Sequence, residues 1–521
     1  MEEITVLSAM ILYLIITIGI GFAYAKTANE NSDNYFLGGR SLGPFVTAMS
    51  AEASDMSGWL LMGLPGVAYF VGLADAFWTA LGLGVGTYLN WLLTAKRLRI
   101  YSHVAEDSIT IPDYFSKRFQ EDSPRIMTIC ALFILIFFTV YASSCFVTVG
   151  KLFSSIFGFH YQTMMIIGAI FVVVYTYMGG FLAESVSDFM QSIVMIIALA
   201  CTVIFGVQAA GGFGVVLENI KSFPGFLEFF QISSPVMENG VQSVVNGVPQ
   251  FGEAKAYGFL TIVSTLSWGL GYFGVPQVLL RFMAIRHAKE ITLSRRIATV
   301  WVLISLFIAV WIGLIGRYLF PTELLTASDS ESIFIHMANM LMPAFVAGIM
   351  MAGILAATMS SSDSYLLIAS SAFAKNLYQG IFRREARDFE VLRVSKITLT
   401  VIAIIAVVLA LDENSVIFQI VSFAWAGFGA TFGPIMIISL FWREATKEGA
   451  FAGIITGGVM VFVWKLLLKP LGGIFGIYEL LPAFLLSLIV IVVVSKVTPK
   501  DPKVLAQFDE YQREVKAHLD F

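Results

Sequence analysis

Charged residues are scarce in this chain of 521 residues, where Asp, Glu, Lys and Arg together make up 13%. A soluble domain carries roughly 25% of such residues. Hydrophobic residues make up 58% of the chain, and the mean hydropathy is +0.82. This balance excludes an ordinary soluble protein and indicates an all-α protein that crosses a lipid bilayer many times.

Cysteine and histidine are also rare, with three and five residues. The cysteines, Cys130, Cys145 and Cys201, are odd in number and lie in apolar segments, so we interpret them as packing residues. The histidines are scattered along the chain, and no His or Cys cluster has the spacing of transition-metal ligands. With no nucleophile–base arrangement or phosphate-binding loop either, the sequence predicts neither an enzyme nor an organic cofactor.

Thirteen membrane-spanning helices are predicted when about 20 apolar residues count as one span. The first is expected to be retained, because its acidic start and its length are wrong for a cleaved signal peptide. The spans lie near residues 4–25, 44–70, 74–95, 127–150, 161–180, 188–210, 256–280, 297–319, 338–375, 395–411, 416–440, 449–468 and 477–495.

The distribution of Lys and Arg predicts the orientation of these spans. Of 32 such residues, 26 fall in loops on one side of the membrane. Cytoplasmic loops carry the excess of positive charge in membrane proteins. We therefore expect the N-terminus outside and the C-terminus in the cytoplasm. The six residues assigned to the outer side are Lys151, Lys221, Lys255, Arg317, Lys465 and Lys469.

Two of the predicted spans contain helix breakers. The span 44–70 is interrupted by Ser54 to Gly58 and by Pro65, and the span 256–280 by three glycines and Pro276. If helices 2–6 and 7–11 form two units of five helices, the units have opposite topology, because five is odd. Broken helices in opposed halves are typical of transporters built from inverted repeats.

This reading divides the chain into six parts. The short charged tail is expected to be solvated, and the loop before the second repeat to form an outer cap of unknown function. The parts are 1–43 (first helix and inner loop), 44–210 (first five-helix repeat), 211–255 (extracellular loop), 256–440 (second repeat), 441–496 (last two helices) and 497–521 (cytoplasmic tail).

Glu52 and Asp55 place two carboxylates inside the first interrupted span. An ionisable side chain near mid-bilayer costs roughly 2.5–3.5 kcal/mol on insertion scales, so such residues usually mark an ion or substrate pathway. Asp55 can cap freed backbone amides, or it can attract a cation to the broken helix, where Ala53 and Met56 offer carbonyl oxygens. We favour the second interpretation.

A second group of oxygens lies in the ninth predicted helix. Ala357, Ser360 and Ser361 are spaced i, i+3, i+4, which puts one carbonyl and two hydroxyls on one helix face. Hydroxyls in helices often only bond back to the preceding turn. Together with the carbonyls of Ala53 and Met56, however, they make five oxygens suited to a hard monovalent cation.

Aromatic residues mark a candidate solute pocket. Trp268, Tyr272 and Pro276 recur at i, i+4, i+8 along the second interrupted span, and Tyr141 lies within the fourth. Each alone is more often a packing or lipid-facing residue. Together with the neighbouring glycines they favour an apolar pocket with hydroxyl and indole donors.

Four uninterrupted strings make the chain resemble the sodium:solute symporter family over nearly its whole length. They are Gly38–Phe45, Ser54–Gly66, Trp268–Gly274 and Ala424–Ala430. The resemblance implies a LeuT-type core of helices 2–11 that works by alternating access. It also implies sodium-driven import of L-proline across the cell inner (plasma) membrane, with sodium as the co-transported ion.

The resemblance further assigns roles to individual residues. It implies a sodium site at Ala53, Met56, Ala357, Ser360 and Ser361, with Asp55 important for sodium coupling and Ser57 next to ion and solute. Positions used for proline match Tyr141, Trp268, Tyr272 and Pro276. Positions linked to transport or gating match Arg40 and Asp188.

Two features depart from this simple transfer. Position 52 is Glu52 where the family pattern has glycine, so Glu52 either carries a proton or changes only stability. Asp363, with Asp188, Ser360 and Ser364, either forms a further cation site or is a helix-interior acid.

Other functions stay open at this point. A different small solute or a proton-coupled mechanism would keep the same machinery. A nutrient sensor is disfavoured by the short tail. As partners the sequence predicts the solute and the lipid bilayer, no nucleic acid, and a monomer.

Overall fold

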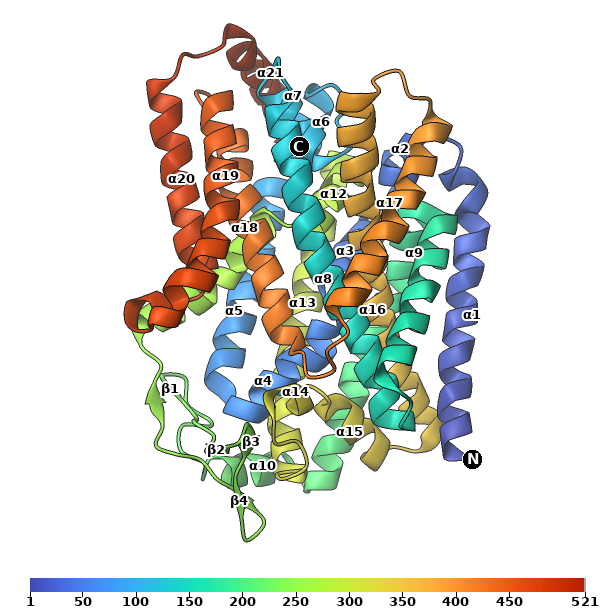
Figure 1. Cartoon of the computed structure of the whole chain (residues 1–521), viewed down its shortest axis with the longest axis vertical. Coiled ribbons are helices and arrows are strands. Elements are labelled where there is room, and N and C mark those ends of the chain that lie inside the picture. Colours follow the sequence, from blue (N-terminus) through green and yellow to red (C-terminus); the bar gives the residue numbers. More distant parts are fainter. Residues whose placement is uncertain (520–521) are drawn as a thin grey trace.

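The computed structural model describes residues 1–519, which are almost entirely helical (Figure 1). The long helices are α1 (Glu2–Ala28), α5 (Leu73–Asn90), α8 (Arg125–Phe157), α9 (Tyr161–Ala210), α13 (Ile291–Leu319), α16 (Ala344–Ser371), α17 (Asp388–Leu409), α18 (Ile417–Phe441), α19 (Lys447–Val463), α20 (Leu480–Val497) and α21 (Pro502–Leu519).

Shorter elements join these helices. The short α-helices are α2 (Ser32–Leu37), α3 (Pro44–Asp55), α4 (Leu64–Val71), α6 (Lys96–Val104), α7 (Ile111–Arg118), α10 (Phe213–Ile220), α11 (Phe259–Leu266), α12 (Pro276–Ala284), α14 (Ala327–Ser330) and α15 (Ile333–Leu341). The 3-10 and π segments are η1 (Gly38–Arg40), η2 (Trp59–Gly63), η3 (Trp91–Ala95), η4 (Ser267–Phe273), η5 (Ala288–Glu290), η6 (Ala372–Phe382), η7 (Trp464–Leu468), η8 (Lys469–Leu471) and η9 (Gly473–Gly476).

Within residues 1–519, six two-residue strands form three antiparallel pairs, β1 with β6, β2 with β3 and β4 with β5. The strands are β1 (Gln231–Ile232), β2 (Met237–Glu238), β3 (Val241–Gln242), β4 (Val244–Val245), β5 (Val248–Pro249) and β6 (Lys255–Ala256). They lie within and just beyond the predicted loop 211–255. Figure 1 places them at the end of the molecule that carries the N-terminus, opposite to α21. We call these the hairpin end and the α21 end.

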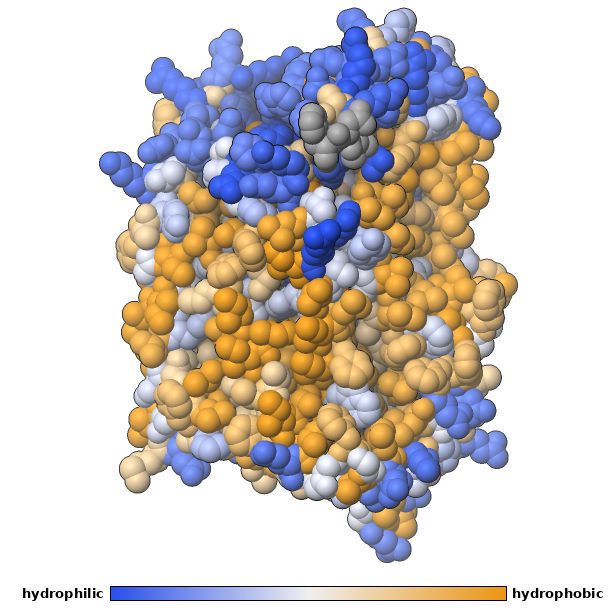
Figure 2. All heavy atoms as spheres, turned by 180° about the vertical axis from the view of Figure 1, so that it is seen from behind, coloured by the Kyte–Doolittle hydropathy of each residue, from blue (hydrophilic) through white to orange (hydrophobic). Residues whose placement is uncertain are grey.

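The helices are apolar enough to cross a membrane repeatedly. Among the described residues, nine helices pass a test of length and hydropathy, and ten do if the bent pair of residues 259–273 and 276–284 counts as one span. Figure 2 shows a broad apolar band between two polar ends. The expected multi-pass architecture is therefore present, while the number thirteen stays a prediction.

Both interruptions predicted in the spans are present. Helix α3 ends at Asp55, and Met56 leaves the helical region with φ −83° and ψ 85° before the chain resumes at η2. The second broken element runs through α11 and η4 to α12, with a bend of 40° between its halves. Each break frees backbone groups that an unbroken helix would have paired internally.

The predicted fifth and sixth helices form one long element, α9, with a sharp change of direction at Gly180. Its φ of 54° and ψ of −154° are not helical. A side chain there is excluded twice, because the positive φ disfavours it and a Cβ would lie 2.7 Å from Tyr35. The kink directs Glu184 and Asp188 into the interior, where both are buried.

The tail after Lys496 differs from the solvated segment that we expected. Residues 502–519 form α21, whose buried residues Val504, Phe508, Tyr511 and Val515 make one apolar stripe. Tyr511 stacks on Tyr101 of α6 at 4.0 Å between ring centroids. Spacing at i, i+4, i+7 and i+11 was present in the sequence, but the surface that it covers, on α6, exists only in the fold.

Replacing Tyr511 with alanine should loosen α21 from this surface. Removing a buried aromatic side chain costs roughly 3–5 kcal/mol, so we expect trypsin to cleave the tail much faster than in the unmodified protein. Limited proteolysis in detergent measures this. The control is Glu510→Ala, because the neighbouring Glu510 is exposed; equal cleavage rates in both variants would contradict the docked helix.

Candidate functional site

The oxygens predicted to hold a cation are brought together by helices far apart in the sequence. Ser360 of α16 donates a hydrogen bond to the carbonyl of Ala53 on α3 at 2.8 Å. Ser361 lies 3.4 Å from the same carbonyl. Ser360 also contacts the carbonyl of Ala357 at 3.1 Å. Four of the five predicted groups therefore lie within one cluster, which we call the oxygen cluster.

The fifth predicted group is the carbonyl of Met56, which lies at the break itself. Its amide still bonds to the carbonyl of Glu52 at 2.8 Å, closing the last turn of α3. The non-helical ψ of Met56 then turns the chain out of the helix. Its carbonyl is consequently not committed to an α-helical bond within α3, as a cation ligand at a broken helix requires.

Asp55 and Glu52 point to different neighbours. Asp55 accepts a hydrogen bond of 2.7 Å from the hydroxyl of Tyr272, so it links the two broken elements. Glu52 accepts one of 3.0 Å from the indole of Trp91. Both carboxylates are buried, and the second oxygen of each has no hydrogen-bond partner among the described residues. The two acids thus belong to separate contacts despite their spacing.

Trp268 lies at the centre of an aromatic group. Its ring centroid is 5.7 Å from that of Trp59, 5.4 Å from Phe418 and 5.2 Å from Tyr478, while its carbonyl accepts a bond of 2.7 Å from the indole of Trp425. A cavity of about 570 Å³ opens beside Trp268 and is also lined by Phe418 and Tyr478. Such a volume is adequate for a small solute.

Tyr141, Pro276 and Ser57 are not among the described residues that line this cavity. Tyr141 of α8 is buried and stacks on Tyr365 of α16 at 4.2 Å between centroids. Pro276 is the first residue of α12, where its fixed φ suits a helix start. Ser57 lies in the break and accepts a bond of 3.3 Å from the amide of Trp59. No contact joins Tyr141 directly to Trp268 in the aromatic contacts of the described residues.

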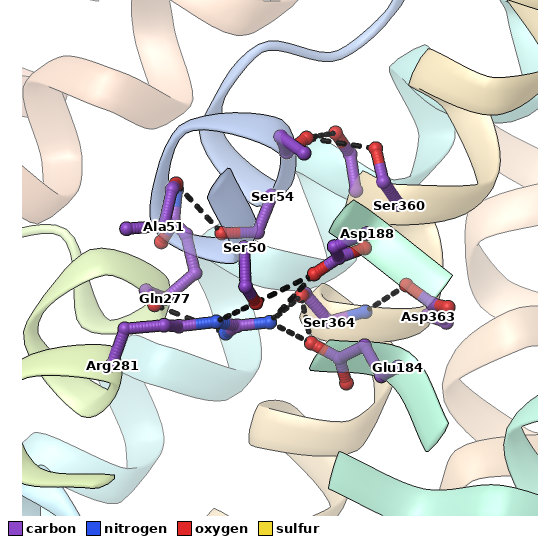
Figure 3. Close-up of polar contacts among 12 residues, drawn as sticks. Ser50, Ala51, Ser54, Glu184, Asp188, Gln277, Arg281, Ser360, Asp363 and Ser364 are labelled. Carbon is purple, nitrogen blue, oxygen red and sulfur yellow. Dashed lines mark hydrogen bonds and ion pairs between the residues drawn. The ribbon is translucent and has the colours of Figure 1, made fainter. Parts of the chain in front are cut away.

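A buried charged group lies one helical turn from the oxygen cluster, at Ser50 of α3 and Ser364 of α16 (Figure 3). Its centre is Arg281, which contacts Ser50 at 3.0 Å, Asp188 at 3.4 Å and Ser364 at 2.8 Å, and also bonds to Glu184. We call Ser50, Glu184, Asp188, Arg281 and Ser364 the arginine cluster.

The arginine cluster bears on two expectations. The predicted span 256–280 ends before Arg281, but α12 continues to Ala284 and buries Arg281 completely. Asp188 and Ser364, predicted to join Asp363 and Ser360 in a further cation site, both contact this guanidinium. Asp363 instead accepts a bond of 2.8 Å from the amide of Ser364, and that further site stays a prediction.

Arg40 ties three segments together at the α21 end. Its guanidinium donates to the hydroxyl of Ser102 at 3.1 Å, the carbonyl of Met283 at 2.9 Å and the carbonyl of Ser108 at 2.6 Å. Burial lowers the pKa of Arg40 to about 10, so the group stays charged at neutral pH. It therefore holds the end of α12 against the α6–α7 segment, a position suited to gating.

Lys151 falls just after the predicted span 127–150, but the helix continues past it. It is buried in α8, with its ammonium 3.0 Å from Glu331 and 2.6 Å from the carbonyl of Ser415. Glu331 accepts further bonds from the amides of Ile417 and Phe418, at the start of α18. This ion pair joins three segments close to the cavity beside Trp268.

Sequence reasoning did not predict four contributors to this interior: Glu184, Arg281, Glu331 and Tyr365. One signal was available, because Glu184 and Asp188 are spaced i, i+4 in an apolar helix. Arg281, which contacts both carboxylates, lies 97 positions after Glu184 and 93 positions after Asp188 along the chain. Pairing at that distance cannot be read from helical periodicity.

Comparison with known proteins places this geometry in a family. The model of the sodium:solute symporter family matches residues 35–457. The chain belongs to the sodium:solute symporter family. It is 40% identical over 503 residues to the osmoregulated proline transporter OpuE of Bacillus subtilis, covering 96% of each chain. It is also 39% identical over 494 residues to a sodium/proline symporter of Staphylococcus aureus, covering 94% of this chain and 92% of that one.

Solved structures agree on the fold of this symporter. A sodium-coupled sialic acid symporter in a substrate-bound, outward-open state matches with a TM-score of 0.75 at 17% identity, over 95% of this chain and 98% of that one. A nucleobase-cation-symport-1 family transporter in a closed conformation matches at 0.54 and 14% identity, over 92% of this chain and 99% of that one. The predicted LeuT-type, all-α membrane fold is confirmed.

Family membership also decides two broader predictions. The relatives are transporters, so the expectation that this symporter is not an enzyme is confirmed. The apolar helices and the family together make it a multi-pass membrane protein.

Proposed function

We propose that this symporter imports L-proline together with sodium by alternating access. The observation that carries the proposal is the contact between the hydroxyl of Ser360 on α16 and the carbonyl of Ala53 at the break of α3. That contact puts hard oxygens of two separate helices where a monovalent cation can bridge them. The curated relatives named as proline transporters support the choice of solute.

In this proposal sodium binds the carbonyls of Ala53, Met56 and Ala357 and the hydroxyls of Ser360 and Ser361. The hydroxyls would turn their lone pairs toward the ion and give up their present bonds to carbonyls. Asp55 supplies negative charge beside the break, where low dielectric strengthens its attraction for a cation.

Proline binds next to the same break. Its ring packs among the aromatic side chains around Trp268, and its charged groups meet Ser57 and the freed backbone groups. Because Asp55 bonds to Tyr272, a cation at α3 also orders the second broken element. If bound sodium increases the affinity for proline, bound proline increases the affinity for sodium by the same factor. The inward sodium gradient sets the direction of transport.

The finer assignments belong to the same proposal. The symporter lies as a monomer in the cell inner membrane, with the N-terminus outside and the α21 end in the cytoplasm, and its two repeats span 44–210 and 256–440. A second candidate keeps the machinery and uses a proton at Glu52, because that buried carboxylate contacts Trp91 rather than the oxygen cluster.

Uptake of labelled proline into liposomes that contain the purified protein tests the proposal. We expect accumulation under an inward sodium gradient and none under an equal potassium gradient, with unlabelled proline competing better than other amino acids. Uptake driven by a pH gradient without sodium would show that the coupling ion is a proton and not sodium. Stronger competition by another amino acid would show that the preferred solute is not proline.

A further inference from the structure

The arginine cluster and the oxygen cluster both contain residues of α3 and of α16. On α3, Ser50 lies three residues before Ala53, and on α16, Ser364 lies three residues after Ser361. Helix α3 begins, and α16 ends, toward the α21 end (Figure 1). One turn from the proposed sodium position toward the α21 end, the guanidinium of Arg281 therefore lies between these two helices, in contact with Ser50 and Ser364.

This guanidinium is held on several sides. It donates to Ser50 on α3 at 3.0 Å and to Ser364 on α16 at 2.8 Å, and it pairs with Glu184 and Asp188 on α9. Asp188 in turn accepts a bond of 2.7 Å from Ser50. Figure 3 shows the arginine crossing from α12 with these side chains around its end. Charge-assisted bonds of this kind are the stronger hydrogen bonds in proteins.

Arg281 belongs to the broken element that carries three of the predicted solute residues, Trp268, Tyr272 and Pro276. Arg281 lies five residues after Pro276 on α12, the half of the second broken element toward the α21 end. The carboxylates around it would attract any cation that moved toward the α21 end. The single positive charge of Arg281 now offsets part of their negative charge, and it can leave only with α12.

We propose that Arg281 is a tethered cation that closes the sodium exit and couples it to solute release. The inference rests on the proposed sodium site and adds a positioning residue to it. While α12 keeps its present position, the guanidinium repels an ion arriving from the oxygen cluster and fills its path. When α12 swings outward to release the solute, Arg281 withdraws, and Glu184 and Asp188 then receive the sodium ion on its way to the cytoplasm.

We call this closure of the sodium exit by Arg281 the latch. Sodium flux in the absence of proline tests it. In liposomes that contain the purified protein, the unmodified symporter should show only background entry of radioactive sodium. For Arg281→Gln we expect the rate of sodium entry to rise about tenfold. This is equivalent to a loss of about 1.4 kcal/mol in the free energy that favours the closed exit. Proline transported per sodium ion should fall in the same variant, because ions then cross without solute.

Removing one partner of a buried ion pair also destabilises a protein. The double variant Arg281→Gln with Glu184→Gln removes one charge of each sign, so it should fold better and still leak. Arg281→Lys keeps the charge with fewer donors and should leak less than Arg281→Gln. The matched control is Arg317→Gln, which removes a buried guanidinium bonded to Gln242 near the hairpin end and should not raise sodium flux.

Sodium-dependent binding of labelled proline to the same purified proteins separates the two proposals. If the unmodified protein binds proline only with sodium, and flux without proline stays at background in the Arg281 and double variants, the latch is overturned while the proposed function stands. If the unmodified protein shows no sodium-dependent binding, the proposed function fails and the latch fails with it.

Discussion

Replacing Asp55 with asparagine is expected to raise the sodium concentration for half-maximal proline uptake about 100-fold, or about 2.7 kcal/mol. Asparagine can still accept the hydrogen bond that Tyr272 donates at 2.7 Å, so the substitution removes charge and keeps shape. A buried carboxylate beside the break contributes Coulomb attraction that water screens little. Uptake at a series of sodium concentrations, at fixed proline, measures the shift.

Glu52→Gln is the matched control for this substitution. It also removes a buried carboxylate from α3, but one that contacts Trp91 and not Tyr272. We expect a much smaller change in the sodium requirement. An equal shift in both variants would mean that the total charge of α3 matters and the position of Asp55 does not. Ser361→Ala, which removes one oxygen of the proposed site, should shift the sodium requirement in the same direction as Asp55→Asn.

Gly58→Ala should nearly abolish transport for a steric reason. A Cβ at this position would lie 2.3 Å from the hydroxyl oxygen of Thr148 on α8. The φ of −50° and ψ of −19° at Gly58 suit alanine, so the clash alone is responsible. Overpacking costs about 1–3 kcal/mol, and the shift of the break would move Ser57 and Met56. Misplacement by about 1 Å can cost 100-fold in rate.

Two variants test this explanation. Thr148→Gly removes all three of the Thr148 atoms that a Cβ at Gly58 would meet, so adding it to Gly58→Ala should restore part of the uptake. Gly19→Ala controls for the loss of a glycine in a membrane helix, because its Cβ would meet no atom within 4 Å. If the added Thr148→Gly restores nothing, the break needs glycine for a reason other than contact with α8.

The sequence predicted the features that depend on short stretches of chain. Helix breakers mark both broken elements because glycine and proline act on their own backbone. The pattern i, i+3, i+4 put Ala357, Ser360 and Ser361 on one face because the period of a helix is fixed. These signals are local, so they predict the candidate oxygen donors without information about which helix packs against them.

Contacts between distant segments could not be predicted in this way. The pairing of Arg281 with Glu184, the pairing of Lys151 with Glu331 and the docking of Tyr511 on Tyr101 join residues at least 97 positions apart. Nothing in the periodicity of one helix states which other helix it meets. The predicted spans therefore end just before Lys151 and Arg281, and the tail is predicted to be solvated.

By itself the sequence determined the membrane class, the broken helices and the residue types of the candidate site, because composition and helical periodicity act within single segments. Only the tertiary structure decided that Asp55 faces Tyr272, that Glu52 faces Trp91 and that a guanidinium lies one helical turn from the oxygen cluster. Those outcomes depend on how the helices pack, since a buried charge is stable only where the fold brings a partner to it.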